Sequence, residues 1–209
     1  MNLLTINETY FFREFPTLQA FAEHCLPKVI DNKKKSVNNK INIWSAGCST
    51  GEEPYTLAII CKEMIDNFEE WEVRILATDI DKTALSRAKI GRYSNRSISK
   101  VPEEYFEKYF YYDNGFYCIA DEIKTLVTFE HLNLMDTLAL RKKRGFDFIF
   151  CRNVLIYFDE ISRRQVVNHF YMALNKGGYI FLGHSESVGR ITSAFKLKKY
   201  GEHLVYIKE

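Results

Sequence analysis

Short apolar stretches alternate with longer helical stretches through most of this chain, and this alternation constrains the fold more than any other feature. Buried strands are predicted at 40–46, 73–79, 125–133, 146–152 and 178–184, and helices at 53–68, 81–91 and 159–174. We expect Gly91 and Asn175 to cap the last two of these helices. Strands that alternate with helices build a mostly parallel sheet covered by helices on both faces. The sequence therefore predicts an α/β fold.

The two ends of the chain lie outside this alternation. Residues 1–30 are predicted to be helical, and the polar, turn-prone stretch 31–40 links them to the first strand. Residues 195–208 are predicted to form a hairpin around Tyr200-Gly201. This hairpin would insert one antiparallel strand into the main sheet.

One internal segment, residues 109–129, also interrupts the alternation. Aromatic runs of alternating polarity flank Asp113, Asn114 and Gly115, and an Asn-Gly pair between such runs is a strong hairpin signal. We predict a small antiparallel unit at this point, inserted in a single domain that spans residues 1–209.

The composition argues against several classes of protein. The net charge is only +2, so the charge balance requires neither nucleic acid nor a membrane as partner. No stretch approaches the roughly 20 apolar residues of a membrane span, and the first residues lack the pattern of a signal peptide. Five widely spaced cysteines without a C-x-x-C pair argue against a disulfide framework and a structural zinc site. We expect a reduced, monomeric, cytoplasmic protein without a bound metal.

A glycine-rich loop follows the first predicted strand, where ligands bind in sheets of this kind. Its residues 47–51, GCSTG, do not match the dinucleotide-binding fingerprint, because Ser49 replaces the middle glycine, or a P-loop, because no lysine follows Gly51. Glu52 and Glu53 come next, and two acids at the start of a helix would repel a phosphate group. The loop suits a cationic ligand with hydroxyl and amino groups, and S-adenosylmethionine meets these requirements.

The second predicted strand ends in Asp79, which supports the same ligand. An acid at this position accepts hydrogen bonds from ribose hydroxyls in this class of fold. Asp79 or Asp81 could instead cap the next helix, and both roles are compatible if Asp79 binds ribose while Asp81 caps. Together, the strand, the glycine loop and the acids favour a methyltransferase that uses S-adenosylmethionine.

Three other segments of the chain could indicate a different function, but none matches its motif well. GHSES, residues 183–187, half-matches the nucleophile elbow of hydrolases, but Ser187 replaces the final glycine and no separate histidine and acid complete a triad. Residues 152–155 do not form the Asn-Pro-Pro-Tyr-like tetrad typical of amino-group methylation. The basic run 141–144 is interpreted as a solvated loop.

Five motifs run in order along nearly the whole chain: NETYFFRE (7–14), SAGCSTGEEPYT (45–56), ATDID (77–81), FDFIFCRNVLIYFD (146–159) and GHSES (183–187). With them the chain resembles the chemotaxis receptor methyltransferases of the CheR family. The resemblance implies a Rossmann-like class I methyltransferase with a seven-stranded, mostly parallel sheet and a small antiparallel β-subdomain. It implies methyl transfer from S-adenosyl-L-methionine to glutamate side chains of chemoreceptor cytoplasmic helical domains, with S-adenosyl-L-homocysteine as product.

The resemblance also implies roles for single residues. Segment 1–30 would cover the cofactor, and Arg13 and Tyr157 would be catalytic, with Arg13 holding either the cofactor carboxylate or the substrate glutamate. Asp79 would bind ribose, and Asn133-Leu134 would lie beside adenine. From the residues alone, Asn133 could equally be a turn residue and Tyr157 an ordinary core aromatic. The implied cofactor-binding residues are Asn7, Thr9, Arg13, Gly47, Glu53, Asp79, Asn133, Leu134, Arg152 and Asn153.

The sequence departs from the family pattern in two places. The family usually begins with a small basic helical domain, and this chain starts at the 7–14 motif, so we expect that domain to be missing. In some members the β-subdomain binds a receptor's C-terminal peptide, but the turn here is short and has Gly115 alone, which argues against that role. Two alternatives stay open: a binding module that holds the cofactor without methyl transfer, and a methyltransferase acting on a carboxylate of a different protein.

Overall fold

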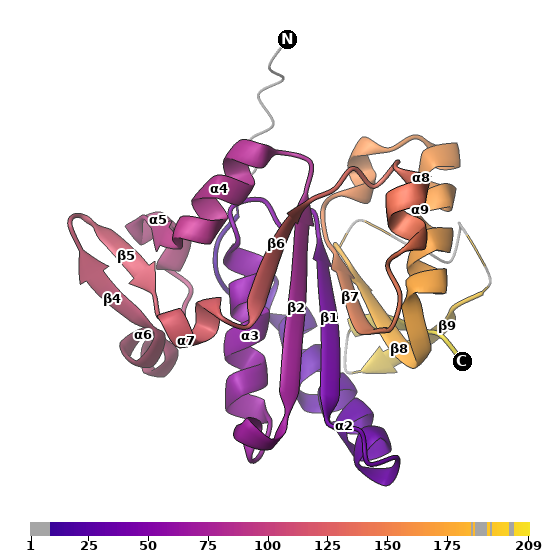
Figure 1. Ribbon diagram of the computed structural model, residues 1–209, viewed down its shortest axis with the longest axis horizontal. Helices are drawn as coiled ribbons and strands as arrows, with labels where there is room; N and C mark the ends of the chain where they lie inside the picture. Colours follow the sequence, from indigo (N-terminus) through magenta and orange to yellow (C-terminus); the bar gives the residue numbers. More distant parts are fainter. Residues whose placement is uncertain (1–8, 185, 187–191, 193, 201–202) are drawn as a thin grey trace.

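A seven-stranded sheet in the order β6-β2-β1-β7-β8-β10-β9 forms the centre of the molecule (Figure 1). This computed structural model describes residues 9–184, 186, 192, 194–200 and 203–209. Neighbouring strands pair in parallel except at β10, which is antiparallel to both β8 and β9. The strands are β1 Lys40–Ala46, β2 Glu72–Asp79, β6 Val127–His131, β7 Phe146–Cys151, β8 Leu174–Leu182, β9 Lys196–Tyr200 and β10 His203–Ile207. The predicted α/β fold with its mostly parallel sheet is confirmed.

The central strands are apolar on both faces, as expected for parallel strands that are covered by helices on either side. Every residue of β7 is buried, and β1 is buried over most of its length after Lys40. Successive side chains point to opposite faces. Phe148 and Phe150 pack in the core on one face, and Ile149 and Cys151 pack in the core on the other.

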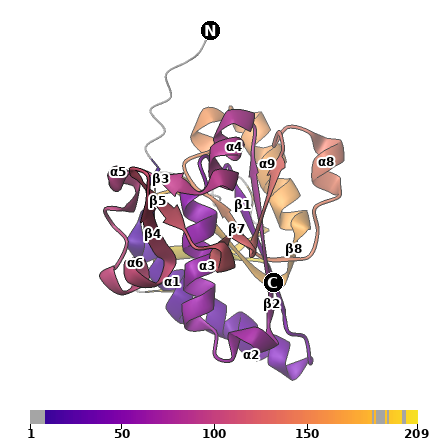
Figure 2. The same ribbon diagram turned by 60° about the vertical axis from the view of Figure 1, so that its left-hand side comes forward.

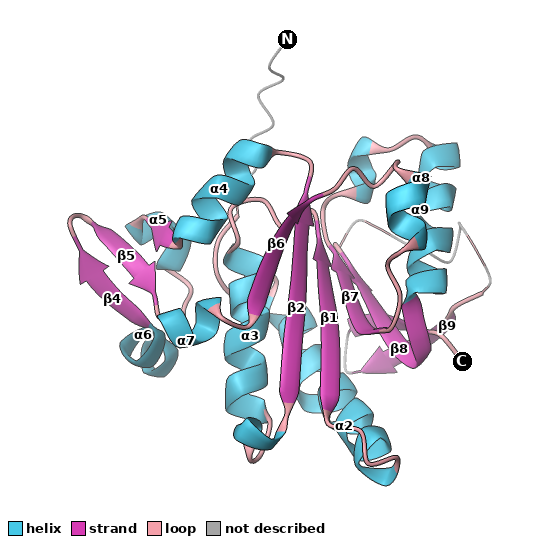
Figure 3. Cartoon of the chain, viewed as in Figure 1, coloured by secondary structure: helices cyan, strands magenta, loops and turns pink. Residues whose placement is uncertain are grey.

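Helices lie on both faces of the sheet (Figures 1 and 3). The N-terminal helices and α3 pack in the first core, and α8 and α9 pack in the second. A π-helical turn, Phe21–Cys25, joins α1 to α2. No helix of the described chain is long and apolar enough to cross a membrane. The helices are α1 Phe15–Ala20, α2 Leu26–Lys35, α3 Glu52–Met64, α4 Lys82–Ile90, α5 Asn95–Ile98, α6 Glu103–Tyr109, α7 Asp121–Lys124, α8 Thr137–Arg141 and α9 Glu160–Ala173.

One of the two predicted helix caps is correct. Gly91 ends α4 in the left-handed conformation, with φ 69°, as its lack of a Cβ allows. The prediction for Asn175 is wrong, because α9 ends at Ala173 and its C-cap is Leu174, whose backbone is already extended. Asn175 lies in β8, where its side-chain amide donates to the Asp147 carboxylate (2.8 Å) and to the Gly145 carbonyl. These two acceptors hold it in the sheet.

A separate three-stranded antiparallel sheet has the order β3-β5-β4, with β3 Arg92–Tyr93, β4 Phe110–Asp113 and β5 Phe116–Ile119 (Figure 2). The predicted hairpin is confirmed, and Asn114 and Gly115 both have the positive φ that its two-residue turn requires. It is shorter than 109–129, because Val127 already belongs to β6. Strand β3 was not predicted, since two residues are too few to show a period. The predicted C-terminal pairing is also confirmed as β9 with β10, while Gly201 of the predicted turn lies outside the described residues.

Candidate functional site

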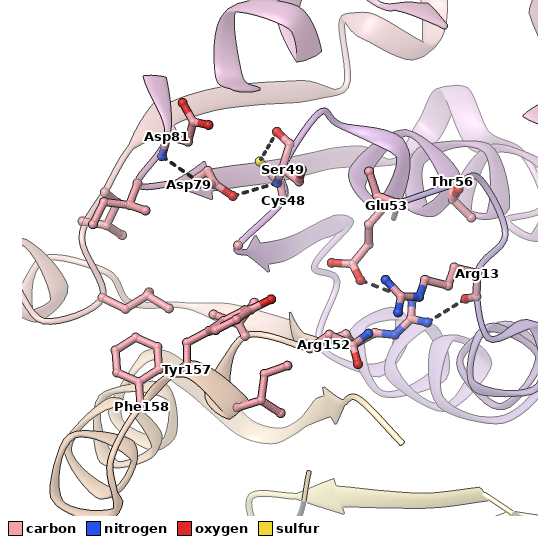
Figure 4. Close-up of a pocket in the computed structure, with 18 of the residues that line it drawn as sticks. Arg13, Cys48, Ser49, Glu53, Thr56, Asp79, Asp81, Arg152, Tyr157 and Phe158 are labelled. Carbon is pink, nitrogen blue, oxygen red and sulfur yellow. Dashed lines mark hydrogen bonds and ion pairs between the residues drawn. The ribbon is translucent and has the colours of Figure 1, made fainter. Parts of the chain in front are cut away.

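A cavity of about 790 Å³ opens at the carboxyl ends of β1, β2, β6 and β7, where ligands bind in open α/β sheets (Figure 4). Every site residue predicted from the sequence lines it, except Asn7, which lies outside the described residues. The cavity is lined by Thr9, Tyr10, Arg13, Leu18, Gly47, Cys48, Ser49, Glu53, Thr56, Asp79, Ile80, Asp81, Leu132, Asn133, Leu134, Arg152, Asn153, Val154, Ile156, Tyr157 and Phe158. The chain thus brings the predicted residues to one place, although their individual roles stay predictions.

The glycine loop after β1 is held by the neighbouring strand. The backbone N–H groups of Gly47 and Cys48 both donate to the Thr78 carbonyl, at 2.8 and 3.0 Å. Gly47 has φ 82°, and a Cβ there would lie 2.3 Å from Cγ2 of Val154. Position 47 therefore requires glycine for two reasons, its backbone conformation and its close contact with the loop after β7.

Asp79 stands at the end of β2 with both carboxylate oxygens engaged by backbone. Oδ2 accepts from the Ser49 N–H at 2.7 Å, and Oδ1 accepts from the Asp81 N–H at 2.9 Å. Asp81 is the residue that caps α4, accepting from the N–H groups of Thr83 and Ala84. A carboxylate has about four acceptor positions. Asp79 can therefore hold the loop and still accept hydrogen bonds from a ligand.

Arg152 is the buried cation of the pocket, with only 4% of its side chain exposed. Its Nη1 pairs with Glu53 at 3.2 Å, and its Nη2 pairs with Glu14 at 3.1 Å and donates to the Arg13 carbonyl at 2.6 Å (Figure 4). Its Nε is buried and has no hydrogen-bond partner among the described residues. An unpaired buried donor is costly, so a shift of this guanidinium that gives Nε an acceptor would be stabilising.

The two glutamates that begin α3 have different surroundings. Glu53 lines the pocket, and burial raises its pKa while Arg152 and the Ser45 hydroxyl, 2.7 Å away, act in the opposite direction. Glu52 is buried behind the loop, and burial raises its pKa as well, against hydrogen bonds from Thr50 and Thr9 among others. Glu52 therefore supports the glycine loop through the Thr50 hydroxyl, a role that its place in a first helical turn did not suggest.

Tyr157 is not a core aromatic. Its side chain is 60% exposed, and its ring points into the pocket from the loop after β7 (Figure 4). Ile156 and Ile80, which also line the pocket, are 49% and 62% exposed. Asn133 both lines the pocket and forms a turn, since its side-chain oxygen accepts from the Met135 N–H. The exposed residues that line the pocket are thus two isoleucines and a phenol together with the polar Asp81 and Asn133.

Glu14 is the main residue that sequence reasoning missed. It belongs to the 7–14 motif, but its partners Arg152 and Asn153 are far along the chain, so no local spacing links them. Thr56 was also missed because it lies inside a helix, yet it lines the pocket and accepts from the Phe12 N–H. Arg13 lines the pocket beside Tyr10, and its guanidinium carbon lies 6.0 Å from the centroid of the Tyr10 ring.

The chain was compared with known proteins. A family model described as CheR methyltransferase, SAM binding domain, matches residues 7–203. The chain is 42% identical over 209 residues to chemotaxis protein methyltransferase 2 of Vibrio cholerae, a match that covers 100% of this chain and 72% of that protein. It is 42% identical over 188 residues to the chemotaxis protein methyltransferase of Borreliella burgdorferi, covering 88% of this chain and 66% of that protein.

The chain belongs to the CheR methyltransferase family. The matched region is that family's S-adenosylmethionine-binding domain, so the cofactor predicted from the sequence is confirmed. The pocket of this CheR-family chain fits such a ligand. Its lining combines the carboxylates of Glu53 and Asp79, the guanidinium groups of Arg13 and Arg152, and the buried apolar side chains of Leu132 and Leu134.

Proposed function

We propose that this chain transfers the methyl group of S-adenosylmethionine to glutamate side chains in the helical cytoplasmic domains of chemoreceptors. The observation that carries the proposal is Tyr157, an exposed phenol at the mouth of a pocket whose floor holds the Arg152–Glu53 pair. The floor suits an amino acid with both charges, and the mouth is open to a second protein. Because receptor cytoplasmic domains are the proposed substrate, we place the reaction in the cytoplasm.

The proposed cofactor contacts follow from which groups line the cavity. Asp79 would accept from ribose hydroxyls, with its backbone bonds keeping the carboxylate in place. Glu53 would face the ammonium group, and the Arg152 guanidinium, which also lines the cavity, would face the carboxylate. Asn133 and Leu134 would border the adenine. Thr9, Arg13, Gly47 and Asn153 complete the wall by their position in the cavity.

The proposed chemistry requires orientation rather than a base. When bound, S-adenosylmethionine supplies an electrophilic methyl group. A solvated glutamate has a pKa of about 4.3, so its carboxylate is already nucleophilic at neutral pH. Arg13 and Tyr157 would hold that carboxylate in line, and the apolar side chain of Ile156 would help exclude water on its side of the mouth. A tight ion pair with Arg13 would reduce nucleophilicity, so its expected role is to orient.

Labelled-methyl transfer to a receptor cytoplasmic fragment tests the proposal. The expected product is a label that alkali releases as methanol, because methyl esters are base-labile and methyl amines are not. A matched fragment with glutamine at its methylation sites should accept no label. Cofactor binding without transfer to any protein would favour a binding module, and transfer only to other proteins would favour a different carboxylate substrate; either result would contradict the proposal.

A further inference from the structure

Glu186 belongs to the GHSES motif and does not line the pocket, yet its carboxylate makes three backbone contacts beside it. Oε2 accepts from the N–H of Gly183 at 2.7 Å and from the N–H of Asn153 at 3.0 Å. Oε1 accepts from the N–H of Ile156 at 3.2 Å. Gly183 follows β8 and Asn153 follows β7, so one carboxylate bridges two neighbouring strands just beyond their last paired residues, Cys151 and Leu182.

The loop that Glu186 holds has a conformation that needs support. Asn153 has φ 59°, in the left-handed region that costs a non-glycine residue free energy. Ile156 lies in the short 3-10 helix Leu155–Tyr157, whose first N–H groups need acceptors from outside the helix. Arg163 donates to two carbonyls of the same turn, that of Leu155 in the helix and that of Phe158 at its C-cap. An acid at the N–H end and a base at the carbonyl end fix its direction.

We propose that Glu186 is a positioning residue for methyl transfer, acting through the 153–157 loop on Tyr157. Tyr157 follows directly after Ile156, so the hydrogen bond from the Ile156 N–H to Glu186 fixes the backbone that carries the phenol. Val154, in the same loop, packs against Gly47 and so couples this loop to the glycine loop. The inference rests on the proposed role of Tyr157 in the reaction.

Space at Gly183 shows how closely the carboxylate fits. A Cβ at Gly183 would lie 2.8 Å from Glu186 Oε2, 2.8 Å from the Asn153 backbone nitrogen and 2.9 Å from Asn153 Oδ1. No side chain fits there without displacing the Glu186 contacts. Gly183→Ala therefore offers a second way to disturb the same loop while Glu186 remains.

The test compares Glu186→Gln with Asp159→Asn. Glutamine can keep one oxygen for Gly183 and Asn153, but its NH₂ then faces the Ile156 N–H, donor against donor. We expect the turnover rate at saturating substrates to fall about ten- to hundredfold, the size of a lost hydrogen bond to a charged group, with the cofactor Kd changed less than about threefold. Asp159→Asn removes a charge from the N-cap of α9, two residues beyond this loop, but keeps its acceptor for Ser162, so its turnover should stay within about twofold.

Two further readouts separate positioning from a general loss of stability. Combined with Tyr157→Phe, Glu186→Gln should slow turnover little further, because both changes act on one group. By NMR, exchange of the Ile156 amide should accelerate at least tenfold in Glu186→Gln, while amides in β1 stay protected. If Glu186→Gln does not fold, Gly183→Ala should give the same reduced turnover with a nearly unchanged cofactor Kd.

Multiplicative effects in the double variant, or an unchanged Ile156 amide, would overturn the inference. A wild-type protein that binds cofactor but methylates nothing would instead contradict the proposed function. Amide exchange would then still report whether Glu186 holds the loop, so the two failures can be told apart.

Discussion

The loops on the two sides of the pocket are held in different ways. On one side, the loops after β1 and β2 hold each other through groups at the ends of these two adjacent strands: the Thr78 carbonyl accepts from the Gly47 N–H, and the Asp79 carboxylate accepts from the Ser49 N–H. On the other side, the loop after β7 is held by side chains from distant segments, Glu14 on Arg152 and Glu186 on Asn153 and Ile156. The first arrangement follows from two adjacent strands, while the second exists only when remote parts of the chain are in place.

This difference has an energetic consequence. Contacts between the ends of neighbouring parallel strands form with the sheet itself. We therefore expect the side built from the loops after β1 and β2, called the cofactor side below, to keep its stability in most single variants. The β7 side concentrates a buried guanidinium and its acids, and removing one member leaves the others without a partner. We therefore expect substitutions on the β7 side to cost more stability.

Arg152→Met should have the largest effect. It leaves Glu53 and Glu14 without their buried counter-charge, which costs about 3–5 kcal/mol of unfolding free energy. Urea unfolding measures this loss. Arg164→Met is the control, because Arg164 is 57% exposed and pairs with Glu160 on the surface, so its loss should stay below about 1 kcal/mol. Equal losses in the two variants would remove the contrast between the two sides.

Gly47→Ala should have an intermediate effect that crosses between the two sides. The new Cβ would meet Val154 at 2.3 Å, and overpacking of this kind costs about 1–3 kcal/mol. Adding Val154→Ala removes the atoms in conflict and should restore part of the stability and the cofactor affinity. The remaining loss should be about 1–2 kcal/mol, because φ 82° stays unfavourable for alanine. A double variant as unstable as the sum of its parts would show that the two loops do not press on each other.

The smallest predicted effect is a pH dependence of cofactor binding. Burial raises the pKa of Glu53 above its ordinary 4.5, and a bound ammonium favours the ionised carboxylate. Affinity should therefore be full above this raised pKa and fall as the pH drops through it, by at most about tenfold per pH unit for one proton. Glu53→Gln should bind more weakly at neutral pH and lose this dependence. Calorimetric titrations between about pH 7 and about pH 5 would measure both slopes, and identical slopes would exclude Glu53 as the titrating group.

Sequence alone reached the cofactor side more completely than the β7 side. Gly47, Glu53 and Asp79 were found because a short motif after a strand places them, and the parallel topology brings such motifs to one edge. Arg152, Asn153 and Tyr157 were predicted from the family resemblance alone. The residues that hold them in place were not predicted. Glu14 and Glu186 act over more than thirty residues of sequence separation, and no period or spacing carries that information.

The elements of the fold that were predicted correctly are those set by local signals in the sequence. Gly91 ends its helix through its own conformation, and the hairpin at Asn114 depends on two residues only. Asn175 was misplaced because its partners Gly145 and Asp147, which decide between cap and strand, lie about thirty residues away. Local sequence signals predicted which helices and strands form, and long-range contacts decided where they end.

The most direct test of the account is a calorimetric titration with S-adenosylmethionine and S-adenosylhomocysteine, using wild type, Asp79→Ala and Asp136→Ala. Asp136 is a matched control, because it also accepts two backbone N–H groups, from Leu138 and Ala139, and does not line the pocket. Both variants should lose similar stability, about 1 kcal/mol by analogy with helix caps. The account predicts micromolar binding by wild type and Asp136→Ala and none by Asp79→Ala. Equal binding by all three, or no binding by wild type, would contradict it.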